Sequence, residues 1–155
     1  MEIGNIQVTL ASISEQTDLC SLHKRNLRHY CGGEIGVALR TWLTPDNDKN
    51  SVFLTVEAIY TDRGRLMLPV LLTYAVTAKF RLNGDLNPIP AVGECLYLPH
   101  HLLTLMLGTV IGAMRGMISL RTAGTSLAGQ PLPLLNVADL AASLSRKTVP
   151  EQETA

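Results

Sequence analysis

Three consecutive segments of the chain alternate apolar and polar side chains in the way that strands of a half-buried sheet do. The segments are residues 34–44, 51–61 and 66–83, and in each of them apolar residues recur at every second position. Turn-forming residues separate them at 45–48 and 62–64. The pattern predicts three strands joined by tight turns, an antiparallel meander with one apolar face and one mixed face.

The segment after this predicted meander is expected to form one long helix. It opens at Pro99, whose missing N–H group costs nothing in a first helical turn, and it is expected to run to about Ile118. Its apolar residues occupy nearly the whole circumference, so the helix is expected to be buried on all sides, which one sheet face cannot achieve. The apolar run stops at Arg115 and is shorter than the roughly 18 residues that a membrane span needs.

Small residues recur at every fourth position of this predicted helix and form a narrow ridge, which consists of Thr104, Gly108, Gly112 and Gly116. Each interior glycine costs a helix about 1 kcal/mol relative to alanine, so the ridge needs a packing reason. Small side chains let two backbones approach closely. Two interpretations stay open, namely close packing on the chain's own sheet and a contact between subunits of a homo-oligomer.

The remaining segments are shorter and complete the expected order of elements. Residues 3–13 predict a strand, 18–33 a short helix or irregular loop, 84–93 a loop, 118–122 a short strand and 124–133 a connector. A second helix is expected after Asn136, a good N-cap, and residues 145–155 are expected to be a disordered tail. The expected fold is therefore a single α+β domain at 1–144, with a four-stranded antiparallel sheet, one long buried helix and a short C-terminal helix.

The composition favours self-association and argues against nucleic acid. Hydrophobic residues make up 46% of the chain and charged residues only 17%, so ions can cover less of the surface than usual. With 13 basic and 13 acidic residues, the formal net charge of zero removes the electrostatic case for nucleic acid or an anionic membrane. The one basic cluster, Lys24, Arg25 and Arg28, is interpreted as a solvated face.

The cysteines and the missing motifs argue against metal, cofactor and catalysis. Three irregularly spaced cysteines and no visible signal peptide indicate reduced thiols and a cytoplasmic protein. Zinc could be held by Cys20, His23, His29 and Cys31, but their spacing is not a common finger and basic residues lie among them, so we predict no zinc. The sequence contains no phosphate-binding loop, no dinucleotide-binding fingerprint and no nucleophile elbow. We expect neither a cofactor nor an enzyme.

Several short motifs follow the predicted meander, namely Leu98-Pro99 at the helix start, Arg115-Gly116 at its exit, a turn at Gly124-Thr125, and residues 133–137 leading to Leu140. With these motifs, the order of elements over residues 34–144 resembles SecB, a family of bacterial protein-export chaperones. The resemblance implies a four-stranded antiparallel sheet with two helices, a dimer of dimers, and apolar grooves that hold unfolded preproteins. The family is acidic, however, and its acidic strand residues, which engage the translocase motor, have no counterpart in residues 36–41. The tail 146–155 has no cysteine or histidine for a zinc-dependent contact with that motor.

The expected function is an ATP-independent holding chaperone, or an export or secretion adaptor, that forms a dimer or tetramer. Expected partners are unfolded or secreted clients and secretion machinery, without nucleic acid or membrane insertion. Groove candidates are the large apolar residues placed near the sheet and the second helix: Trp42, Phe53, Tyr74, Phe80, Leu134 and Leu140. One alternative is an assembly scaffold for a single protein partner. The other is a hot-dog thioesterase, which needs a carboxylate at the helix start or at the sheet edge; the helix start offers only His100 and His101, with Glu94 just upstream.

Overall fold

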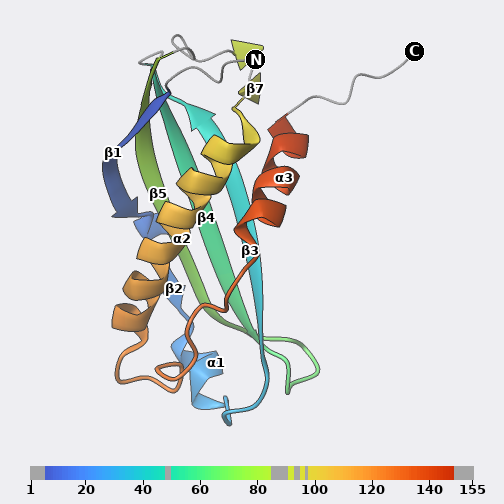
Figure 1. Ribbon diagram of the computed structural model, residues 1–155. Helices are drawn as coiled ribbons and strands as arrows, with labels where there is room; N and C mark the ends of the chain where they lie inside the picture. The colour runs from blue at the N-terminus through green and yellow to red at the C-terminus, as the bar shows by residue number, and fades with distance from the viewer. Residues whose placement is uncertain (1–5, 48–49, 85–90, 93–94, 97, 149–155) are drawn as a thin grey trace, which may run out of the picture.

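The computed structural model describes residues 6–47, 50–84, 91–92, 95–96 and 98–148 (Figure 1). Its main sheet is antiparallel and five-stranded, with four long strands in the order β1-β5-β4-β3 and a short β2 that pairs with β5. The strands are β1 (Gln7–Glu15), β2 (Ser21–Leu22), β3 (Ile35–Pro45), β4 (Ser51–Asp62) and β5 (Val70–Asn83). A separate two-stranded sheet consists of β6 (Ala91–Val92) and β7 (Cys95–Leu96). The helices are η1 (Thr17–Leu19), α1 (Lys24–Arg28), α2 (His100–Thr122) and α3 (Val137–Thr148).

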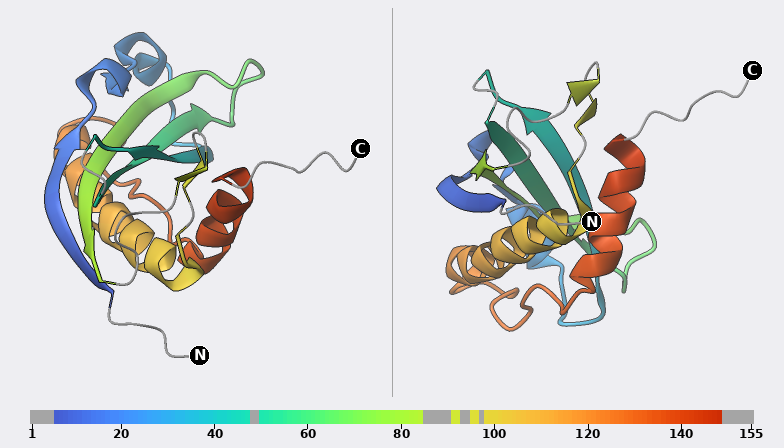
Figure 2. Two further views of the ribbon diagram at one scale, coloured as in Figure 1. Left: turned by 90° about the horizontal axis from the view of Figure 1, so that it is seen from above. Right: turned by 45° about the horizontal axis from the view of Figure 1, so that its top comes forward.

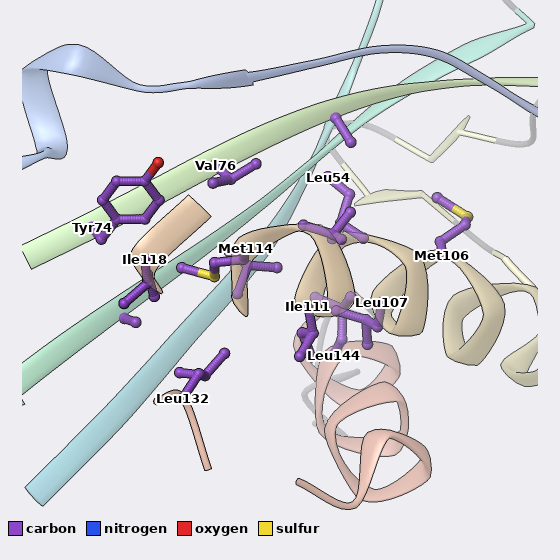
Figure 3. Packing of buried hydrophobic residues seen from close by; sticks show 14 of the residues in the cluster. Leu54, Tyr74, Val76, Met106, Leu107, Ile111, Met114, Ile118, Leu132 and Leu144 are labelled. Atoms are coloured by element: carbon purple, nitrogen blue, oxygen red, sulfur yellow. The ribbon is translucent and has the colours of Figure 1, made fainter. Parts of the chain in front are cut away.

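The predicted α+β class and the meander of β3, β4 and β5 are confirmed, and the four long strands match the expected four-stranded sheet. Cross-strand register places the apolar alternation of the strands on one face, where Leu54 lies opposite Ala78 and Val56 opposite Val76. The helices α2 and α3 lie side by side on this inner face (Figures 1 and 2). The core fills the space between the two layers (Figure 3).

One side of α2 is buried in this core and the other side faces outward. The inner side carries large apolar residues that are almost fully buried, among them Leu103, Met106, Leu107, Ile111 and Met114 (Figure 3). The expectation that α2 is buried all round is wrong for the single chain.

On the outer side, Leu105 is 57% exposed and Leu120 is 80% exposed. A Cβ atom built on Gly108, Gly112 or Gly116 meets nothing within 4 Å. The small-residue ridge therefore does not pack on the chain's own sheet, which excludes one of the two interpretations.

Several boundaries differ from the predicted ones. Residues 118–122 are not a strand but the last turn of α2, because Ile118 continues the buried stripe and the Thr122 hydroxyl donates to the Ile118 carbonyl at 2.8 Å. The strand expected from residue 66 begins at Val70, since residues 63–69 form the turn. In the expected tail, residues 145–148 belong to α3, and 149–155 lie outside the described residues.

Two local predictions about helices are confirmed. The region 18–33 contains the short helix α1, preceded by η1 and β2. At the start of α3, the Asp139 N–H donates to Oδ1 of Asn136 at 3.3 Å, so Asn136 acts as the predicted cap. Of the predicted loop 84–93, Ala91–Val92 is β6, while 85–90 and Gly93 lie outside the described residues.

The helix α2 is, among the described residues, the one helix long and apolar enough to cross a membrane, judged by length and composition alone. Its most apolar window has a mean hydropathy of 1.6, and 44% of that window is buried inside the chain. Arg115 lies within the helix, where its guanidinium donates to the carbonyls of Leu132 and Pro133 at 3.2 Å each. In this fold α2 is the central helix of the core, and Arg115 ties the connector to it.

Candidate functional site

The strand β3 forms one edge of the main sheet. It pairs with β4 along an unbroken register from Ile35 to Pro45, and its other side pairs with no strand among the described residues. The small strand β7 lies near β3 but pairs only with β6. An edge of this kind presents a row of free backbone donors and acceptors that can pair with another chain. The opposite edge, β1, is interrupted by a register shift between Leu10 and Ser12, which makes it a poorer template.

On the helix-covered face, partly buried apolar side chains follow this edge. They come from β3, from the connector and from α3, and all pack against the core while remaining accessible; we call them the β3–α3 seam, which consists of Val37, Leu39, Leu43, Leu135, Val137 and Leu140. Figure 1 shows α3 lying beside β3. The seam therefore offers apolar contacts directly next to unpaired backbone.

On the opposite face of the sheet, polar cross-strand pairs surround two aromatic rings. Arg40 Nε lies 3.1 Å from Oε1 of Glu57, whose side chain is only 7% exposed. The Lys79 ammonium lies 5.8 Å from the centre of the half-buried Phe53 ring. Trp42 is 37% exposed. Since Arg40 is paired, Trp42 is the large apolar side chain that β3 offers on this face.

The six groove residues predicted from the sequence do not lie on one surface. Tyr74 and Phe80 are 1% and 2% exposed in the core, because they face the helices on the central strand β5. No client can reach these two in this conformation. The other four come from four different segments: Trp42 from β3, Phe53 from β4, the 91% exposed Leu134 from the connector, and Leu140 of the seam from α3.

The strand leucines Leu39 and Leu43 are two of the five seam residues that are not among the predicted groove residues; the other three are Val37, Leu135 and Val137. Alternation in residues 34–44 did place the two leucines on the apolar face of a strand. It could not show that this strand would be at an edge, where such a face stays partly open. Edge position depends on strand order, which local periodicity does not encode.

A partly exposed polar cluster joins β1, β5 and the end of α2. The carboxylate of Glu15 accepts hydrogen bonds from the Tyr74 hydroxyl and from Arg121, whose Nη2 lies 2.6 Å from Oε2. The bonds from Arg121 and Tyr74 hold the pKa of Glu15 below its usual range, and burial raises the pKa of Tyr74. A cavity of about 90 Å³ next to the cluster is lined by Cys20, Ser21 and Leu22 among others. All three groups are engaged with one another, so the cluster serves as a tie between elements.

Three of the four candidate zinc ligands of the N-terminal region have other partners for their side chains. Cys20 Sγ lies 3.4 Å from the Ala75 carbonyl, His23 Nε2 lies 3.5 Å from the Thr73 hydroxyl, and Cys31 Sγ lies 3.5 Å from the His29 carbonyl. Among the described residues no group of three or more His, Cys, Asp or Glu side chains is placed to hold a metal ion.

Purified protein is therefore expected to contain no stoichiometric zinc. Elemental analysis after extensive dialysis measures this directly. A content near one zinc per chain that is lost in Cys20→Ala would contradict the prediction.

For the thioesterase alternative, the start of α2 supplies His100 and His101, both exposed. Glu94, the carboxylate that this alternative would require, lies outside the described residues.

No protein-family model matches the sequence, and a search of curated proteins finds no significant match. Among solved structures, the chain is similar to a SecB-like chaperone of Mycobacterium tuberculosis in complex with a ChAD peptide from an antitoxin. The two chains are 12% identical, the alignment covers 85% of this chain and 90% of that chain, and the TM-score is 0.46. At this identity and TM-score the similarity does not assign a family.

Proposed function

We propose that the chain is an ATP-independent holding chaperone, or an export or secretion adaptor, of the cytoplasm, and that it binds extended polypeptide along β3. The observation that carries this proposal is the unpaired 11-residue edge of β3, with accessible apolar side chains on both faces. An extended client can add to such an edge as a further strand. Its alternate side chains then fall on the β3–α3 seam and on the Trp42 side.

The chemistry of this surface favours clients that are unfolded and varied in sequence. Backbone hydrogen bonds to β3 do not depend on the client's side chains, and the seam supplies aliphatic contacts rather than a specific polar pocket. A disordered client loses conformational entropy when it binds, so several apolar contacts along the strand are needed for useful affinity. No nucleotide is needed for binding of this kind.

The outer face of α2 supports a second part of the proposal, namely that the protein assembles as a homo-oligomer. This face exposes Leu105 and Leu120 beside the small-residue ridge, and Gly108, Gly112 and Gly116 leave room for a close neighbour. A second copy packed on the ridge would cover both leucines. The β3 edge lies on a different part of the chain and would stay open to a client.

The protein is expected to suppress aggregation of an unfolded client without nucleotide. The double variant Trp42→Ser/Leu134→Ser is expected to bind the client about tenfold more weakly than the wild type. Trp42 is 37% exposed on β3, and Leu134 is 91% exposed in the connector, next to the seam residue Leu135 in the chain. Removal of a large apolar contact from an interface centre costs about 1–2 kcal/mol. Light scattering of a denatured client and a titration with an extended fluorescent peptide measure the two effects.

Leu66→Ser is the matched control, because Leu66 is 103% exposed on the β4–β5 turn and away from the seam. It is expected to leave client binding unchanged. A wild-type protein that ignores every unfolded client but binds one folded partner tightly would replace the chaperone with the assembly scaffold. An equal loss of client binding in Leu66→Ser would show that clients do not bind at the β3 edge.

A further inference from the structure

The turn between β4 and β5 displays three consecutive large apolar side chains to solvent. Leu66 is 103% exposed, Met67 is 91% exposed and Leu68 is 54% exposed. Scattered exposed apolar residues are ordinary, but a contiguous group at the tip of a turn marks a contact surface. Nothing among the described residues covers this tip. We call these three residues the apolar tip.

The turn holds the apolar tip in a defined conformation. The Asp62 N–H donates to the Pro69 carbonyl at 3.0 Å, and Oδ1 of Asp62 accepts from the Gly64 N–H at 2.9 Å. Within the turn, the Leu68 N–H donates to the Arg65 carbonyl at 3.1 Å. Leu68 has a φ of 45°, which is unfavourable for a leucine and is found where a constrained turn enforces it. The three apolar residues are therefore held in place by a hydrogen-bonded turn.

Basic side chains gather at the same end of the molecule as the apolar tip. The exposed residues Lys24, Arg25 and Arg28 of α1 lie at the same end of the molecule as Arg63 and Arg65 of the turn (Figure 1). The acidic residues of this end are Glu34, whose carboxylate is 3.8 Å from Arg63, and Asp62, which is 3% exposed. This end is therefore strongly basic although the whole chain is neutral, so the zero net charge does not remove the case for an anionic surface.

An open cleft of about 700 Å³ joins α1 to the turn. Arg25, Asn26 and His29 line it from α1 and its C-terminal end, and Arg65, Leu66 and Met67 line it from the turn. Guanidinium groups at both sides of the cleft can bind a phosphate group. The apolar residues of the same cleft continue directly into the tip.

We propose that this end of the molecule docks on an anionic phospholipid surface. The tip enters the boundary between headgroups and acyl chains, and the basic residues of the same end contact lipid phosphates, one of which can enter the cleft. Interfacial segments have this arrangement, with apolar groups buried about 5–10 Å and Lys or Arg at the level of the headgroups. The surface is separate from the β3 edge, so the inference does not depend on the proposed polypeptide binding.

The shape of the tip favours lipid over a folded protein partner. Leu66 and Met67 are 103% and 91% exposed, so solvent surrounds each side chain on nearly all sides, and a flat rigid surface would cover only part of each. Fluid acyl chains can surround such a tip on all sides. An acidic amphipathic peptide would complement the positive charge of this end equally well. The experiment therefore includes such a peptide as a separate probe.

The first experiment measures co-sedimentation of the full chain with vesicles at low salt. Vesicles of phosphatidylcholine with phosphatidylglycerol are expected to bind it, pure phosphatidylcholine vesicles are not, and binding should weaken as salt screens the charges. The double variant Leu66→Ser/Met67→Ser is expected to lose at least tenfold in affinity. Arg25→Ala and Arg65→Ala are each expected to lose about fivefold, the value of one basic residue at an anionic surface.

Matched controls carry the same changes elsewhere on the surface. Leu134→Ser removes a leucine that is 91% exposed, and Arg81→Ala removes an exposed arginine near the opposite end of β5 (Figure 1). Both are expected to bind vesicles like the wild type. Because all the substituted side chains are exposed, circular dichroism should show the same melting curve for every variant.

A second measurement gives a gain of signal. The chain has one tryptophan, Trp42, so Met67→Trp in a Trp42→Phe background reports only on the tip. Its emission is expected to shift to the blue on vesicles that contain phosphatidylglycerol, as it would in an apolar environment.

Three results would overturn the proposal. The first is no binding to anionic vesicles at low salt, and the second is an equal loss of binding in the two control variants. The third is tight binding of an acidic amphipathic peptide of alternating glutamate and leucine, dependent on Leu66 and Arg65, without any binding to vesicles. That last outcome would assign the surface to a protein partner.

Discussion

Gly112→Leu will separate the proposed oligomer into single chains without weakening the fold of each chain. A Cβ atom at this position meets nothing within 4 Å, so the new side chain fits the isolated chain. Leucine is also the better helix former by almost 1 kcal/mol, which corresponds to a rise of about 2–4 °C in melting temperature for a chain of this size. In an assembly packed on the ridge, the same side chain holds two backbones apart at a cost of about 1–3 kcal/mol per contact.

Static light scattering gives the mass, and thermal unfolding is compared with wild type diluted until it is a single chain, because assembly itself raises apparent stability. Leu107→Met on the buried side of α2 is the control, since it conserves side-chain volume and should leave the mass of the assembly unchanged. A monomer mass for the wild type at micromolar concentration would contradict the oligomer. An unchanged oligomer in Gly112→Leu would place the contact away from the ridge.

Tyr74→Ser will destabilise the chain by about 3–5 kcal/mol and lower its melting temperature by roughly 10 °C or more. Tyr74 is 1% exposed, lies opposite Ala58 in the sheet, and donates its hydroxyl hydrogen to Glu15. The substitution removes the ring from the core and leaves a cavity. Thermal and urea unfolding followed by circular dichroism measure the loss.

Tyr74→Phe is the matched control, because it keeps the ring and removes only the hydroxyl. The Glu15 carboxylate keeps its two bonds to Arg121, so the loss should be about 1 kcal/mol. Since the pKa of Glu15 is lowered from 4.5 in the folded state, this stabilisation is present above pH 4.5 and is lost as the pH falls through the folded pKa. The difference in the free energy of unfolding between Tyr74→Phe and the wild type should therefore become smaller at acidic pH. A Tyr74→Ser protein of wild-type stability with weak client binding would instead place Tyr74 on the binding surface.

Features that depend on neighbours in the sequence could be predicted well. The alternation in residues 51–61 specifies a strand because side chains of a strand point to opposite faces, whatever lies around it. Asn136 is a good helix cap for a reason contained in its own side chain. The end of α2 was predicted wrongly, because the alternation of apolar Ile118 and Leu120 with polar neighbours fits a short strand as well as the last turns of a helix. The burial of Ile118 in the core decides for the helix.

The candidate site could be predicted only in part, because exposure depends on the order of strands and not on residue type. Trp42 and Tyr74 are both large aromatic residues of predicted strands, yet Trp42 is 37% exposed and Tyr74 is 1% exposed. Strand order puts β3 at the edge and β5 between β1 and β4. Successive side chains of a strand point to opposite faces of the sheet, so the position of each residue in its strand then decides whether it faces the helices.

The sequence by itself determined the α+β class, the meander, the long apolar helix and its ridge of small residues, because periodicity and turn chemistry are local properties. Only the tertiary structure decided which face of α2 is covered, which strand keeps a free edge, and where charge and apolar surface meet. The basic residues of α1 and the apolar tip are about 40 positions apart in the chain, and the fold brings them to one end of the molecule. Net charge is a sum over residues and carries no positions, so the sequence total of zero could not reveal that end.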